Sequence, residues 1–102
     1  MSLTQFVAEY DRQTDLTRDD FVNNSIGKTV DWSGKVIDVS SDYSVTIDIP
    51  GTLLSTVDVM NVSPDDAKLL RIDNYIHFTG EISRIVNFFG LHIYVENGKI
   101  IK

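Results

Sequence analysis

From residue 28 onward, apolar and polar residues alternate with a period of two, and this pattern constrains the fold more than any other feature of the chain. The clearest example is the run in which Val45, Ile47 and Ile49 alternate with Thr46 and Asp48. Successive side chains of a strand point to opposite faces of a sheet, so this run has one apolar and one polar face. Turn-forming residues divide the alternating runs, which predicts several short strands.

The first strand is predicted over residues 28–39 and contains a change of phase. Trp32 lies on the inward-facing phase and is expected in the core, whereas Ile37 and Val39 leave that phase a few residues later. A phase change next to Gly34 predicts a β-bulge at this point.

The other strands are bounded by turn-forming residues. Pro50–Gly51 separates the second strand from the third, and Asn87–Gly90 closes a hairpin between the fourth and the fifth. Asn97–Gly98 is a favoured two-residue hairpin turn, so residues 99–102 are predicted to fold back as an extra strand. The four strands are predicted over residues 43–49, 53–62, 75–86 and 91–95.

The amino-terminal part of the chain has a helical pattern instead. Apolar residues at three-and-four spacing predict an amphipathic helix over residues 4–13. Thr17 and Asp20 resemble a capping box for a second helix that ends at Gly27, with residues 14–16 as the joint.

A third helix is predicted between the third and fourth strands. Ser63 can cap it, Pro64 suits its first turn, and two aspartates favour its positive end. It is expected to end near Leu70.

Five strands, with a helix between the third and fourth and a glycine-marked bend in the first, are the order of an OB-fold barrel. The segments Ile26–Val39 and Leu70–Ile82 resemble the bacterial OB-fold families related to tRNA-anticodon-binding-like domains, which commonly carry a glycine, a hydrophobic strand and a second glycine in each. The resemblance covers residues 26–95. One departure is Asp73, which stands in a turn where those families usually have glycine.

The resemblance implies a mainly β protein, and a length of 102 residues leaves room for one domain. A five-stranded OB-fold barrel is expected over residues 28–102, with an N-terminal helical segment over residues 1–27 packed on it. OB barrels bind oligonucleotides, oligosaccharides or proteins, so the resemblance predicts the fold more specifically than the ligand.

Charge bears on the choice of ligand. Fifteen acidic and nine basic residues give a net charge of −6, and the cations stand no closer than three residues apart. Binding to nucleic acid or to membrane surfaces through charge depends on clustered cations, so the composition disfavours both. The absence of cysteine excludes disulfides and thiolate chemistry.

Catalytic and metal sites are not predicted. No serine, histidine and acid arrangement and no phosphate-binding glycine loop is present. If Val86 pairs with Leu91, His92 faces Ile85, and His77 lies far along the ladder opposite a residue near Ile100. The two histidines are then too far apart to share a metal ion, so no catalytic residue, metal or cofactor is expected.

The resemblance places ligands across the second and third strands, between the loops at residues 40–43 and 87–90. Phe88 and Phe89 stand in a tight hairpin tip, and at least one is a candidate stacking or anchoring side chain. The alternative is that both fold back and plug the barrel. Four further residues are candidates for a small binding platform: Lys35, Tyr43, Arg84 and Tyr94.

These features predict a small non-catalytic binding module, and a protein partner is preferred because it requires only an apolar anchor and a polar rim. The alternative is weak binding of single-stranded nucleic acid through the same face, which needs aromatic residues interleaved with cations. A secretory signal and a membrane-spanning apolar run are not recognisable, so a cytoplasmic location is expected.

Overall fold

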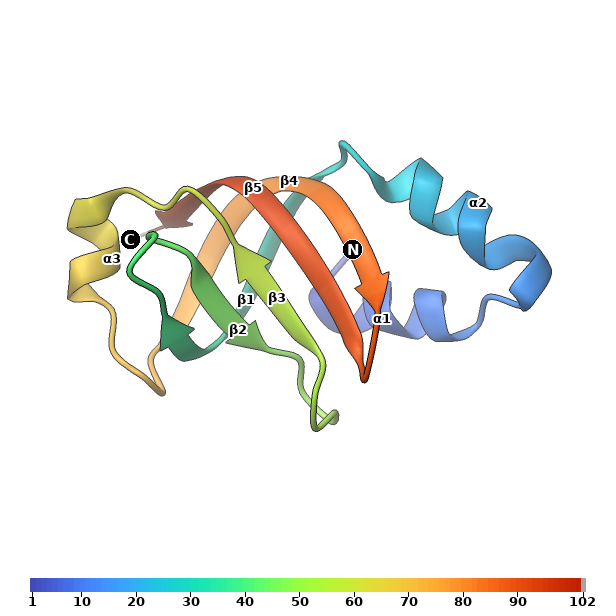
Figure 1. The fold of residues 1–102 in the computed structure, drawn as a ribbon, viewed down its shortest axis with the longest axis horizontal. Coiled ribbons are helices and arrows are strands. Elements are labelled where there is room, and N and C mark those ends of the chain that lie inside the picture. The colour runs from blue at the N-terminus through green and yellow to red at the C-terminus, as the bar shows by residue number, and fades with distance from the viewer. Residues whose placement is uncertain (102) are drawn as a thin grey trace.

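The structure is a computed structural model that describes residues 1–101, and its five strands form a closed barrel (Figure 1). The strand order is β1-β2-β3-β5-β4, in which β3 and β5 are parallel and the other neighbours antiparallel. The elements are α1 (Leu3–Asp11), α2 (Asp15–Ser25), β1 (Thr29–Val39), β2 (Val45–Asp48), β3 (Thr56–Val59), α3 (Pro64–Leu69), β4 (Tyr75–Asn87) and β5 (Leu91–Ile101). The predicted mainly β fold, with two N-terminal helices and a short helix after the third strand, is confirmed.

The barrel closes because β1 changes its partner partway along its length. Residues 29–35 pair with β4, whereas Val36 and the residues after it pair with β2. A Cβ atom at Gly34 would collide with the side chain of Ile47, so this position needs glycine. The predicted bulge is present, but it falls at Ile37, between Val36 and Asp38.

The core lies inside the barrel and continues beneath the N-terminal helices. Trp32 is only 3% exposed, which confirms its predicted place in the core. Its ring packs edge-on against Phe78 and is tilted against Phe6 of α1. The fully buried side chains are Phe78, Ile47, Ile49, Ile82, Ile93, Val36, Val45, Val57, Val59 and Val95.

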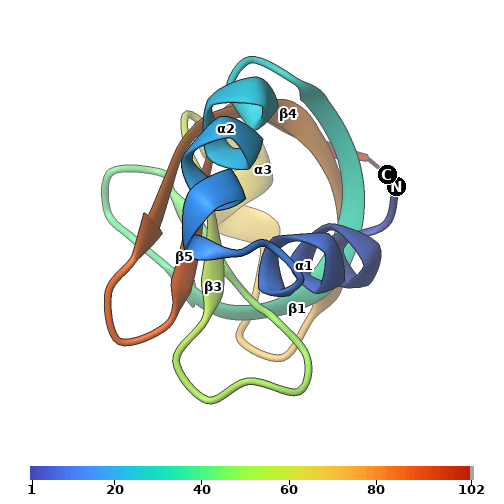
Figure 2. The same ribbon diagram turned by 90° about the vertical axis from the view of Figure 1, so that its right-hand side faces the viewer.

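Helices α1 and α2 lie across one end of the barrel, as the view along the long axis shows (Figure 2). Phe6 and Tyr10 of α1 pack against Phe21 of α2. The predicted start of the second helix is wrong by about three residues, because Thr14 rather than Thr17 occupies the N-cap. Thr17 instead supplies the side chain that accepts the backbone N–H of Thr14.

Asn97–Gly98 does not form the predicted hairpin turn. β5 continues through it to Ile101, and the two residues oppose the single residue Gly80, which makes a bulge. Asn97 takes the left-handed conformation, with φ of 54°, and the Gly98 N–H donates to the Met60 carbonyl at 3.0 Å. The two glycines allow β4, β5 and the end of β3 to approach closely, so residues 99–101 lengthen β5 rather than form an extra strand. Residue 102 lies outside the described residues.

The length of the third strand and the register of the last hairpin also differ from prediction. The third strand covers only Thr56–Val59, not residues 53–62. In the β4–β5 hairpin Val86 pairs with His92 and Asn87 with Leu91, so the predicted register is wrong by one residue. The cause is the turn, in which Phe89 and Gly90 both have positive φ and three residues rather than four join the strands.

Candidate binding surface

The outer face of β2, β3, β5 and β4 carries a row of side chains in cross-strand register. Thr46 pairs with Asp58, Asp58 with Tyr94, and Tyr94 with Arg84. The Thr46 hydroxyl donates to the Asp58 carboxylate at 2.9 Å, and the Arg84 guanidinium lies 5.7 Å from the centre of the Tyr94 ring. The row therefore contains a cation–π pair, Arg84 with Tyr94, and a carboxylate, that of Asp58, which already accepts a hydrogen bond.

A second row lies on the same face, two residues nearer the β4–β5 turn along each strand. The Nδ1 atom of His92 lies 2.9 Å from the Thr56 hydroxyl, and its Nε2 atom lies 3.1 Å from the Phe88 carbonyl. One neutral tautomer satisfies both contacts, with Nε2–H as donor and Nδ1 as acceptor. His92 thus connects the strand face to the turn that carries Phe88.

The β1–β2 loop bounds this face at one end. Tyr43, expected at the start of the second strand, lies in the loop with φ of 65° and is 40% exposed. Its carbonyl accepts the Val62 N–H at 3.2 Å. The side chain and backbone of Ser44 donate to Asp42 and hold the pKa of that carboxyl below its ordinary value.

The β4–β5 turn bounds the face at the other end, and both of its phenylalanines point to solvent. Phe88 is 67% exposed and Phe89 is 75% exposed, with their rings edge to face at 4.6 Å between centroids. The prediction that at least one points outward is confirmed. The alternative, in which both plug the barrel, is wrong.

Two leucines that the sequence assigned to a strand extend this apolar surface. Leu53 and Leu54 lie in the β2–β3 loop and are 99% and 61% exposed. The loop lies against the turn, because the Leu91 N–H donates to the Ser55 hydroxyl at 2.9 Å and a Cβ atom on Gly90 would be 2.8 Å from the Leu54 carbonyl. We call the four side chains of Leu53, Leu54, Phe88 and Phe89 the apolar tip.

The sequence did contain a signal for the leucine half of the apolar tip. Adjacent residues of a strand face opposite sides, so Leu53 and Leu54 cannot both point into the barrel. The chain segments around the two leucines and the two phenylalanines also lack charged side chains. Residues 49–57 contain no ionisable side chain, and residues 85–95 contain only His92 and Tyr94.

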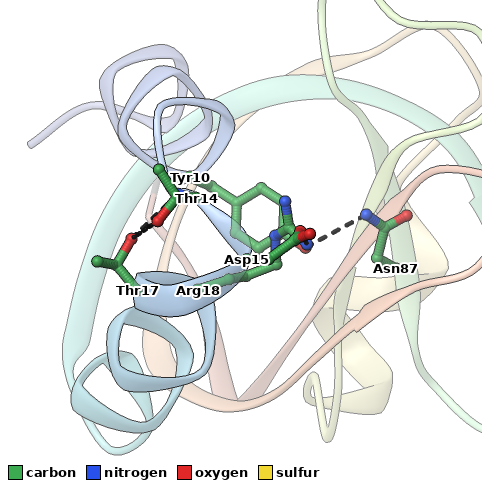
Figure 3. Close-up of polar contacts among 6 residues, drawn as sticks. All are labelled: Tyr10, Thr14, Asp15, Thr17, Arg18 and Asn87. Atoms are coloured by element: carbon green, nitrogen blue, oxygen red, sulfur yellow. Dashed lines mark hydrogen bonds and ion pairs between the residues drawn. The ribbon is translucent and has the colours of Figure 1, made fainter.

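The N-terminal helices brace the base of the apolar tip. The Asn87 side-chain amide donates to the Tyr10 hydroxyl at 3.3 Å (Figure 3). Within α2, the Arg18 guanidinium pairs with the Asp15 carboxylate at 3.1 Å, while the Arg18 Nε is buried with no hydrogen-bond partner among residues 1–101.

The candidate platform is not a single surface. Arg84 and Tyr94 lie together in the β4–β5 hairpin, and Phe88 and Phe89 lie in the turn that ends the same hairpin. Lys35 is separate. It pairs in register with Tyr75, nine residues from Arg84 and so about 30 Å away along β4.

The Lys35 ammonium lies 4.0 Å from the carboxylate of Asp73 in the turn before β4. Asp73 holds φ of 74°, so the turn keeps its left-handed conformation without glycine. Tyr43 is likewise distant from the apolar tip, because the β1–β2 and β4–β5 loops lie at opposite ends of β2 and β3 (Figure 1).

The two histidines stand apart. His77 lies opposite Ile101 and bonds to the Asp31 carboxylate, whereas His92 faces Val86. Within residues 1–101 no group of three His, Asp or Glu side chains gathers as it would around a metal ion. No helix in this part of the chain is long and apolar enough to cross a membrane.

No protein-family model matches the chain, and no curated protein matches it in sequence. Among solved structures, a "putative nucleic acid-binding lipoprotein" from Klebsiella pneumoniae subsp. pneumoniae MGH 78578 is similar, with a TM-score of 0.71. The two are 15% identical, and the match covers 100% of this chain and 92% of the other. At that identity the likeness shows a shared OB-like fold and nothing more specific.

Proposed function

We propose that the chain is a small non-catalytic binding module that docks onto a protein partner through the apolar tip. The observation that carries this proposal is the exposure of four large apolar side chains, between 61% and 99%, on two loops held against each other. Large apolar side chains exposed together in one region of a protein surface mark interaction sites. Aromatic side chains at the centre of such a surface supply most of the binding energy in many interfaces.

The surroundings of the apolar tip define the partner's chemistry. The two loops are uncharged, so the partner would offer an apolar pocket at this point. The whole chain carries a net charge of −6, so a positively charged rim on the partner would speed association. The strand face with Asp58, Tyr94 and Arg84 would supply the polar rim on this side.

Photo-crosslinking tests this proposal directly. With p-benzoylphenylalanine in place of Phe89, we expect one dominant crosslinked protein in cells, and we expect its isolated form to bind the unlabelled chain. The double variant Phe88→Ser/Phe89→Ser should lose that binding. Its free energy of unfolding should stay within about 0.5 kcal/mol of the parent's, as is usual for substitutions at exposed positions.

The matched control is Leu69→Ser/Ile72→Ser. These two residues are 69% and 65% exposed and lie in α3 and just after it, away from the apolar tip. The control should bind the partner as the parent does. Equal loss in both double variants, or equal binding by all three proteins, would contradict the proposal.

A second candidate function is weak binding of single-stranded nucleic acid across the strand face. The stacked Arg84 and Tyr94 pair supports it, as does the description of the Klebsiella protein as nucleic acid-binding. Asp48 and Asp58 lie on the same face and would repel phosphates. Affinity for a labelled oligonucleotide should therefore be weak at low salt, fall steeply toward physiological salt, and disappear in Arg84→Glu.

Lys35→Glu is the matched control for that test, because Lys35 is far from the Arg84 and Tyr94 pair. It should reduce oligonucleotide binding only slightly. Submicromolar affinity that persists at physiological salt would instead make nucleic acid the preferred ligand.

A further inference from the structure

A pocket of about 350 Å³ lies between the N-terminal helices and the start of β1. This volume is within the range of about 300 to 1,000 Å³ that is usual for small-molecule sites. The pocket shares no lining residue with the apolar tip. It is lined by Met1, Phe6, Phe21, Ser25, Lys28, Thr29, Val30, Asp31, Trp32 and Ile82.

The inner wall of the pocket is apolar and largely aromatic. The Phe6 ring lies 5.4 Å from the ring of Phe21 and 5.4 Å from that of Trp32, measured between centroids. Phe6 and Trp32 are buried, and the Trp32 Nε1–H donates to the Met1 carbonyl at 3.0 Å. The indole donor is therefore satisfied, and the wall offers an entering molecule mainly apolar contact.

Two charged side chains line the pocket, Asp31 and Lys28, and they differ in whether they already have a partner. Asp31 lines it but bonds to His77 on the neighbouring strand. Lys28 also lines the pocket and is exposed. Its ammonium pairs with no carboxylate among residues 1–101. In a chain with a net charge of −6, this pocket thus presents a free cation beside an apolar cavity.

We propose that this pocket binds a small anionic amphiphile, with its apolar body against the aromatic wall and its carboxylate at Lys28. The apolar wall supplies the burial and the ammonium supplies the preference for an anion. The site is independent of the proposed docking at the apolar tip.

Octanoate is the probe, and Trp32 is the reporter because it is the only tryptophan of the chain. Octanoate at millimolar concentration should shift the single indole N–H resonance in ¹H–¹⁵N spectra and change tryptophan fluorescence along the same saturation curve. Octanol has the same chain without the charge and should bind more weakly. Acetate has the charge without the chain and should cause no shift.

Lys28→Gln should weaken octanoate binding roughly fivefold and leave octanol binding unchanged, as the loss of one exposed ion pair implies. Lys99→Gln, an exposed lysine on β5, is the control and should bind octanoate as the parent does. The proposal is overturned if octanoate leaves the indole resonance in place, if octanol binds as tightly as octanoate, or if the shifts fall only on residues 53–54 and 88–89.

Discussion

The Asn87 side-chain amide donates to the Tyr10 hydroxyl across 3.3 Å, although the two residues are 77 positions apart. Asn87 is the last residue of β4 before the Phe88–Gly90 turn, and Tyr10 is buried in α1. The bond therefore ties the helical segment to the base of the apolar tip.

Tyr10→Phe should loosen the apolar tip without unfolding the chain. The ring keeps its packing against Phe21, and only one hydrogen bond to the exposed Asn87 is lost. We expect a loss of about 0.5 to 1 kcal/mol in the free energy of unfolding, together with faster amide exchange at residues 88–90. Unchanged exchange there would show that the bond does not hold the turn.

Trp32→Ala should be among the most damaging single changes. Trp32 is 3% exposed and contacts both Phe6 and Phe78, so its removal leaves a large cavity between the helices and the barrel. We expect a loss of about 3 to 5 kcal/mol, measured by denaturant unfolding followed by circular dichroism. A melting temperature within a degree or two of the parent would contradict this place in the core.

Asp73→Gly should stabilise the chain slightly. Asp73 holds φ of 74°, which glycine adopts without steric cost, and its ion pair with Lys35 is exposed and 4.0 Å long. We expect a gain of up to about 1 kcal/mol in the free energy of unfolding by thermal melts. Asp73→Ala should lose stability by comparison with Asp73→Gly, and the reverse order would refute the conformational argument.

Ser44→Ala should raise the pKa of Asp42 toward its ordinary value near 3.8, because the Ser44 hydroxyl is the main cause of its lowering. A carboxyl with a lowered pKa in the folded state stabilises the fold at pH values above its unfolded pKa, and this contribution disappears as pH falls through the folded pKa. The stability difference between parent and variant should therefore narrow in acid below about pH 3.8. A ¹³C-detected titration of Asp42 that is unchanged in the variant would contradict the assignment.

The alternating pattern was sufficient to predict the barrel because strand faces depend on local sequence. Val57 and Val59 alternate with polar neighbours and are fully buried, as expected. The hairpin turn predicted at Asn97–Gly98 was wrong because the same dipeptide suits both a hairpin turn and a β-bulge. Which of the two forms depends on the hydrogen bond to Met60, a residue distant in sequence.

The candidate binding surface was predicted only in part, for the same reason. Phe88 and Phe89 are consecutive in the chain and were identified, whereas their association with Leu53 and Leu54 depends on how two hairpin loops meet. Lys35 and Arg84 each suit a binding platform by residue type. Their separation along β4 follows from the register of β1, which the sequence pattern does not specify.

Every strand of the barrel has a hydrogen-bonded neighbour on both sides, and the parallel pairing of β3 with β5 is the step that completes the ring. A sheet left open at that point would present the backbone groups of two valine- and isoleucine-rich strands to other molecules. β3 is only four residues long, so its separation from β5 would expose only a short run of unpaired backbone groups. The shortness of β3 therefore limits the unpaired backbone edge that an opened barrel would offer to another chain.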